Sequence, residues 1–215
     1  MIRLVPIFLL LFFFLSACSD SLEYSPNQIH DDDSPTELNY KNLAKLKESE
    51  EDDTLTIVFA GDSQQFYDEV DRFVNRVNQI ADADLIFIAG DISDFGLLQE
   101  FEWVAERLAD LRKPYFGVIG NHDVVSNGEE VFKHMFGPLN FSFVYDSVKF
   151  ILHNTNSREY LGTKVPDIGW LQHELEPEAG VKNYVAVSHV PPFQGDFNAD
   201  LEEGYTSLFR EAPGA

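Results

Sequence analysis

The stretch Leu55-Thr56-Ile57-Val58-Phe59-Ala60-Gly61-Asp62 decides the fold of this chain. Its first six residues are apolar or β-branched, which predicts a short buried strand, and Gly-Asp follows at once. Asp84 to Ala89 repeats this pattern before Gly90-Asp91. Pro114 to Ile119 repeats it again before Gly120-Asn121-His122-Asp123. The sequence therefore predicts three buried strands that each end in a polar motif.

Two amphipathic helices are predicted between these strands. Apolar residues recur at i, i+3 and i+4 spacing over Phe66 to Ile80 and again over Leu97 to Leu111. Strands that alternate with helices predict an α/β fold, in which ligands bind at the carboxyl edge of the sheet. The polar motifs are expected to meet at that edge.

The later part of the chain has a different pattern of apolar residues. Two aromatic, alternating runs flank Asp146-Ser147, which predicts a hairpin with a two-residue turn. A further buried strand is predicted to deliver Ser188-His189 to the same edge. The expected elements are strands over Phe141 to Tyr145, Val148 to Leu152 and Tyr184 to Val187, and helices over Asp167 to Leu175 and Leu201 to Arg210.

The N-terminus has the features of an export signal. The apolar run Leu4 to Leu15 is shorter than the ~20 residues of a membrane span but suits a signal peptide. Leu15-Ser16-Ala17-Cys18 resembles the bacterial lipobox, and Cys18 is the only cysteine of the chain. We expect residues 1–17 to be a lipoprotein signal peptide and Cys18 to carry a lipid anchor. The mature protein would face the periplasm or the cell surface. The alternatives are an uncleaved hydrophobic anchor and a chance cysteine beside a signal peptide.

Residues 18–53 are expected to form an acidic, disordered tether, with at most a short helix around Leu38 to Lys47, before a domain over residues 54–215. The net charge is −22. Such a surface repels the phosphates of nucleic acids, so no nucleic-acid partner is expected unless metals neutralise one cleft.

The strand-end residues suit a pair of divalent metal ions. Such ions lie about 3.5–4 Å apart and need one shared anionic ligand, for which Asp91 is the natural choice because a carboxylate has two oxygens. Asp62 and Gln64 lie two residues apart and can reach one ion. Asn121 and His189 offer an amide oxygen and an imidazole nitrogen to the other.

His122 and Asp123 are then expected to be the catalytic residues. His122 is placed to meet the leaving-group oxygen, and Asp123 and Asp94 would orient it and its loop. The alternative interpretation treats Asp62, Asp91 and Asn121 as helix caps and turn formers, which these residue types also suit.

The ordered motifs resemble those of the calcineurin-like metallophosphoesterase family, whose core is that of purple acid phosphatases. The resemblance covers Thr54 to about Pro192. It implies a four-layer α/β/β/α sandwich of two mixed sheets and two ions of Mn, Fe or Zn. It also implies hydrolysis of a phosphomonoester, a phosphodiester or a pyrophosphate, with a phosphorylated small molecule or ester as substrate.

Two departures from the family pattern change what the resemblance implies. Gln64 stands where the family has a histidine, and an amide oxygen favours Mn²⁺ over Zn²⁺ at that ion. No histidine follows His189, so the family's GHxH motif is absent. The expected domain is incomplete at its C-terminus. The alternative functions are a truncated or degenerate lipoprotein that binds metal or phosphate without turnover, or an acidic lipoprotein for adhesion or assembly.

Overall fold

The computed structural model describes residues 25–46, 54–160, 165–191 and 199–212. The predicted signal peptide over residues 1–17 and the predicted lipid anchor Cys18 lie outside the described residues. Within the described ranges, no helix is both long enough and apolar enough to cross a membrane.

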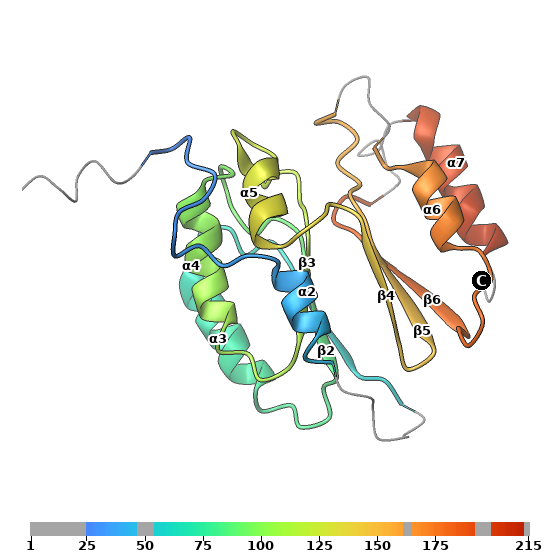
Figure 1. Ribbon diagram of the computed structural model, residues 1–215, viewed down its shortest axis with the longest axis horizontal. Helices are drawn as coiled ribbons and strands as arrows, with labels where there is room; N and C mark the ends of the chain where they lie inside the picture. Colours follow the sequence, from blue (N-terminus) through green and yellow to red (C-terminus); the bar gives the residue numbers. More distant parts are fainter. Residues whose placement is uncertain (1–24, 47–53, 161–164, 192–198, 213–215) are drawn as a thin grey trace, which may run out of the picture.

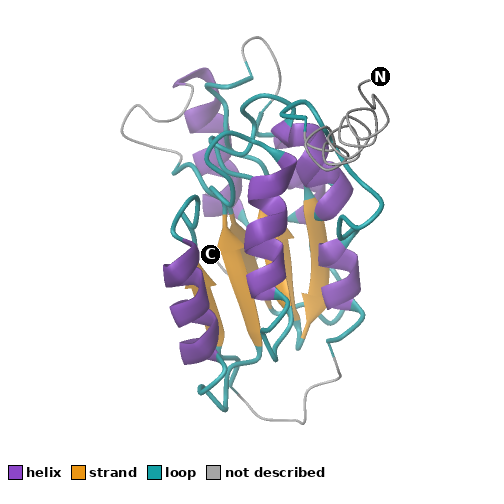
Figure 2. Cartoon of the chain, turned by 90° about the vertical axis from the view of Figure 1, so that its left-hand side faces the viewer, coloured by secondary structure: helices purple, strands orange, loops and turns teal. Residues whose placement is uncertain are grey.

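The first sheet is parallel and has the strand order β1-β2-β3. Crossover helices connect its strands and cover one face, as Figure 2 shows with the helices in front of the strands. The elements of this half are β1 (Ile57–Ala60), α3 (Tyr67–Val77), β2 (Leu85–Ala89), α4 (Leu98–Leu108), β3 (Tyr115–Val118) and α5 (Gly128–Met135).

The second sheet is mixed and has the strand order β4-β5-β6, in which β5 pairs antiparallel with β4 and parallel with β6. The hairpin turn is the predicted one, because Asp146 and Ser147 have φ angles of 49° and 59°, as the tightest hairpins require. The elements of this half are β4 (Phe141–Tyr145), β5 (Val148–Leu152), α6 (Ile168–Glu174), β6 (Asn183–Val187) and α7 (Ala199–Glu211).

The two sheets face each other across an aromatic core. The ring of Phe87 on β2 lies 5.3 Å from that of Phe150 on β5, and Phe116 on β3 lies 4.4 Å from Phe143 on β4. Alternate residues on β2 point the other way, so Ile86 and Ile88 pack under the helices of the first half. The layers run helices, sheet, sheet, helices, as Figure 1 shows. The four-layer sandwich is confirmed, although among the described strands only the second sheet is mixed.

Residues 25–46 belong to the segment predicted as a tether, and they carry helix α2 (Leu38–Leu43), which falls within the short helix expected around Leu38 to Lys47. The helix lies along β3. The side chain of Asn39 donates to the carbonyl of Gly117 at 3.0 Å and accepts from its N–H at 2.9 Å. Asn42 accepts from the N–H of Tyr115 at 3.3 Å. Two buried asparagines thus supply hydrogen-bond partners to backbone groups at the edge of β3, as a fourth strand would. The average hydrophobicity of the segment does not reveal these contacts.

Candidate metal centre

Four strand ends place the predicted ligands. Asp62 follows β1, Asp91 follows β2, Asn121 follows β3, and His189 follows β6 of the other sheet. The first two loops continue the parallel pairing of their strands, since the N–H of Gln64 donates to the carbonyl of Asp91 at 3.0 Å. The site therefore lies at the carboxyl edge of the first sheet, where it meets the second.

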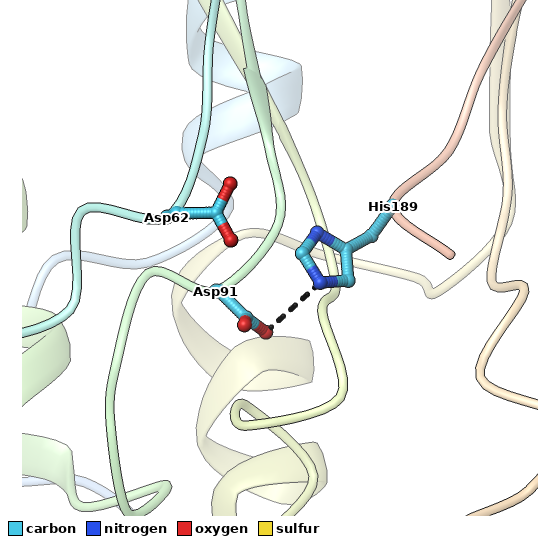
Figure 3. Close-up of side chains that lie close together, drawn as sticks. All are labelled: Asp62, Asp91 and His189. Carbon is cyan, nitrogen blue, oxygen red and sulfur yellow. Dashed lines mark ion pairs between the residues drawn. The ribbon is translucent and has the colours of Figure 1, made fainter. Parts of the chain in front are cut away.

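Three of these side chains form a compact cluster. Donor atoms of Asp62, Asp91 and His189 all lie within 4.8 Å of one another, and Figure 3 shows the two carboxylates and the imidazole facing a common space. His189 Nε2 lies 3.3 Å from Asp91 Oδ1 and 3.1 Å from Asn121 Oδ1. Ligand atoms around one divalent ion lie about 3 Å apart, because each bond measures about 2.0–2.2 Å. The donor set fits a divalent cation.

The His189 ring is held in the orientation that a ligand needs. Its Nδ1 lies 2.8 Å from the carbonyl of Ala89 and donates to it, which leaves Nε2 to face the cluster. Burial alone would lower the pKa of His189, but the hydrogen bonds to Asp91 and Ala89 outweigh it and raise the pKa to about 9. A cation that binds Nε2 therefore displaces a proton from it.

Asp91 is the more enclosed of the two cluster carboxylates, and its side chain is 5% exposed. Burial acts to raise its pKa, yet the hydrogen bonds from His189 and from the backbone of His122 lower it overall. Its Oδ1 accepts the His122 N–H at 3.0 Å, and its Oδ2 accepts from Gln64 Nε2 at 3.1 Å. Asp91 stays ionised and touches the loops on both sides, which suits a shared ligand.

The backbone at three of the predicted ligands is left-handed. The φ angles are 53° at Asp62, 32° at Gln64 and 52° at Asp91. Non-glycine residues rarely adopt such angles, and each costs on the order of 1–3 kcal/mol unless its surroundings hold it. The strain is concentrated where the carboxylates converge.

The glycines of the motifs make room for the cluster. A Cβ on Gly120 would lie 2.1 Å from Asp91 Oδ1, and a Cβ on Gly90 would lie 2.6 Å from the ring of His189. Gly90 also has a φ of 84°. Each glycine therefore permits a ligand from another strand end to pack directly against its backbone.

His122 lies at the rim of the site, with its side chain 42% exposed. Its Nδ1 lies 3.0 Å from the carbonyl and 3.1 Å from Oδ1 of Asp94. The Asp94 carbonyl is the main cause that raises the pKa of His122, against the opposing effect of partial burial. His122 is thus a cation or proton donor whose Nε2 is left for another group.

Asp123, expected to be catalytic, lies beneath the site and has no exposed surface. It is fully buried, and its carboxylate accepts from the N–H and hydroxyl of Ser93 at 2.7 and 3.0 Å and from the N–H of Gly120 at 2.8 Å. Burial outweighs these hydrogen bonds and raises its pKa to about 6. The Asp123 carboxylate thus connects the loop after β2, at Ser93, with the loop after β3, at Gly120. Asp94 is the residue that contacts and orients the His122 ring.

Sequence reasoning missed a polar segment that follows β5. Thr155 Oγ1 accepts the N–H of Val190 at 2.9 Å, and Asn156 Nδ2 donates to the carbonyl of Ile119 at 3.3 Å. Both side chains are fully buried. The run Asn154 to Ser157 carries the same signal as the other motifs, a polar run directly after a strand, but without a leading glycine.

A pocket of about 700 Å³ opens beside the cluster. Its lining includes the predicted ligands Asp62, Asn121 and His189, together with Arg158 and Glu159. A small phosphorylated molecule has room to reach the cluster from this side.

A match to a family model shows the family to which the chain belongs. The model of the calcineurin-like phosphoesterase family matches residues 55–210, which is more than half of the chain, so the protein belongs to that family. A protein of Xenorhabdus bovienii (strain SS-2004), named as a probable cyclic nucleotide phosphodiesterase, is 29% identical over 63 residues. That match covers 29% of this chain and 26% of the other.

Among solved structures, a purple acid phosphatase from seeds of yellow lupin (Lupinus luteus) has a similar fold. The TM-score is 0.52 at 13% sequence identity, and the match covers 72% of this chain and 36% of the phosphatase. The chain thus spans about a third of that structure and about a quarter of the curated relative.

Proposed function

We propose that this protein hydrolyses a phosphoester with the help of two divalent metal ions. The observation that carries the proposal is the convergence of Asp62, Asp91 and His189 within 4.8 Å at the carboxyl edge of the first sheet. Membership of the calcineurin-like phosphoesterase family supports it. Asp62 and Gln64 would hold one ion, Asn121 and His189 the other, and Asp91 both.

Bound ions of this kind supply Lewis-acid activation of water and neutralise the charge that develops on the phosphoryl group. The chain's own groups do the rest. The Ala89 carbonyl fixes the His189 tautomer that presents Nε2, and Gln64 holds the second oxygen of Asp91 at 3.1 Å. These contacts fix the geometry of the ligands before the substrate arrives.

His122 would donate a proton to the leaving group. Its Nδ1 is held by Asp94, so Nε2 is the nitrogen available to the substrate. The Asp94 carbonyl raises the pKa of His122, which favours the protonated form that can donate. A general acid matters most for esters with poor leaving groups. Its removal therefore affects an alkyl phosphate more than a nitrophenyl phosphate.

The test is an assay of the purified full chain with Mn²⁺, Fe²⁺ or Zn²⁺ on p-nitrophenyl phosphate, its bis ester and an alkyl phosphate. Asp91→Ala is expected to lose both bound metal and turnover. His122→Ala is expected to keep its metal and lose turnover by about 10²–10⁴-fold on the alkyl ester. His173→Ala is the matched control, because His173 is a histidine with a side chain 75% exposed on α6.

The result also separates the enzyme from the alternative functions. Turnover that depends on Asp91 supports the hydrolase. Metal retained without turnover on any ester supports a non-catalytic binding protein. A protein that holds no metal and cleaves nothing overturns the proposed function.

We further propose that the protein is exported and held at the membrane through Cys18. The apolar run Leu4 to Leu15 and the lipobox-like residues before the single cysteine support this. Metabolic labelling with a tagged fatty acid should mark the wild-type chain in bacteria and leave Cys18→Ser unlabelled. Equal labelling of both chains would refute the anchor.

A further inference from the structure

The pocket beside the cluster contains one cationic side chain whose role the metal site leaves unexplained. Arg158 is the only lysine or arginine among the described residues that line it. The protein carries a net charge of −22, and Glu159 lines the same pocket. A negatively charged substrate therefore meets a repulsive surface, which bound metal, His122 at the rim and this guanidinium would offset.

The segment that leads into the turn of Arg158 is hydrogen-bonded to the ligand loops of both sheets. Just before it, Thr155 accepts the N–H of Val190, next to the ligand His189. Asn156 donates to the carbonyl of Ile119, two residues before the ligand Asn121. The backbone that leads to Arg158 is thus tied to a ligand loop of each sheet, and its exposed side chain starts from a fixed place beside the cluster.

Among the residues that the structure describes, the guanidinium of Arg158 makes no hydrogen bond and no ion pair. Other arginines of the chain do pair, as Arg72 does with Glu69 and Arg107 with Asp71. In an acidic protein, an arginine that lines a pocket without a carboxylate partner is free to hold an incoming anion.

We propose that Arg158 binds the phosphate group of the substrate, and the phosphate product, in the pocket that the metal ligands also line. This inference rests on the proposed function of the same site. A guanidinium offers parallel N–H donors that match two phosphate oxygens, so it adds orientation as well as charge. Arg158 is therefore a substrate-binding residue and takes no part in holding metal.

The experiment measures binding of inorganic phosphate to the metal-loaded full chain by isothermal titration calorimetry in Mn²⁺. Arg158→Gln should weaken phosphate binding at least tenfold, and Arg158→Lys should recover part of the loss. Both should keep the wild-type metal content. The KM for p-nitrophenyl phosphate should rise in parallel, with a smaller change in kcat.

Arg112→Gln is the matched control. Arg112 is an exposed arginine that precedes β3, at the end of the strand away from the site. Its substitution makes the same change of charge and should leave phosphate binding unchanged. An equal loss in both variants would show a general effect of net charge and overturn the proposal.

The other outcomes are equally decisive. Phosphate binding by Arg158→Gln at wild-type strength overturns the role of Arg158, as does a loss of metal in that variant or a wild-type chain that binds no phosphate. Phosphate binding that depends on Arg158 in a chain without turnover supports the role of Arg158. That result would contradict the hydrolase alone.

Discussion

Single residues at the strand ends are constrained by the atoms that pack against them. The backbone of Gly120 lies against the carboxylate and backbone of Asp91, and a methyl group in this place has nowhere to go. The ligand itself prevents any side chain at this position. The tightest steric limit in the site thus falls on a residue that has no functional group.

We expect Gly120→Ala to destabilise the fold by about 1–3 kcal/mol, the usual cost of overpacking, and to weaken Mn²⁺ binding. Urea unfolding and metal titration measure the two effects. Gly204→Ala on α7 is the control, since no atom lies within 4 Å of its added Cβ. That variant should gain up to about 1 kcal/mol from helix propensity. A Gly120→Ala protein as stable as the wild type would contradict the packing argument.

A second prediction concerns His153, which is buried and bonded through Nε2 to the hydroxyl of Tyr205 at 2.9 Å. Burial lowers its pKa to about 4, whereas the pKa in the unfolded chain is about 6.5. The unfolded chain binds more protons between these values, so stability falls as pH falls from about 6.5 towards 4. Between pH 7 and pH 5 this one group removes about 2 kcal/mol.

Urea unfolding at both pH values measures this loss. His153→Gln should reduce the difference between pH 7 and pH 5 by about that amount, while His173→Gln, at an exposed position, should leave it unchanged. Identical pH dependence in wild type and His153→Gln would refute the assignment.

Among the elements, α2 has a role that its length does not suggest. It is six residues long, yet its asparagines pair with backbone groups of β3 that would otherwise be open. An unpaired sheet edge is a site for association with other chains. The helix therefore completes the first sheet as well as filling space beside it.

We expect Asn39→Leu to destabilise the fold by about 2–4 kcal/mol, because it leaves the N–H and carbonyl of Gly117 buried without partners. Chemical unfolding gives the free energy, and light scattering reports association through the exposed edge. Asn75→Leu, at an exposed position on α3, should change stability by about 0.5 kcal/mol or less. Similar effects of the two substitutions would show that Asn39 does not protect the edge.

The sequence predicts much of this arrangement, and its failures share a cause. Each strand and its polar ending could be predicted because hydrophobic pattern and motif are local, so Asp62, Asp91, Asn121 and His189 were expected at one edge. Asn39 bonds to a residue 78 positions away. The polar composition of the segment around Asn39, taken alone, indicates disorder. The burial of Asp123 likewise depends on where another loop passes. Such contacts become visible only when distant segments are placed together.

At the scale of the whole molecule, the cluster joins the two sheets. Asp62 and Asp91 come from the first sheet and His189 from the second, as Figure 3 shows. A cation held by both Asp91 and His189 would tie the two halves of the sandwich together. Metal binding and global stability are therefore coupled.

We expect Mn²⁺ at about 100 times its Kd to stabilise the protein by about 2.7 kcal/mol, with full reversal by EDTA. Thermal or urea unfolding with and without metal measures the increment. Asp91→Asn should unfold at the same point in both conditions. A wild-type protein whose unfolding is unaffected by Mn²⁺, Fe²⁺ and Zn²⁺ would contradict the coupling.

The hydrogen bond between His189 and Ala89 also has a consequence for how the chain folds. It joins residues 100 positions apart, so its closure carries a large loop entropy that the nearby pairings of β1, β2 and β3 do not. Long-range contacts of this kind slow folding and form after local ones. The first sheet can assemble from its neighbouring segments, while the ligand His189 arrives only when β6 docks. The complete set of metal ligands therefore forms only late in folding, after β6 has docked.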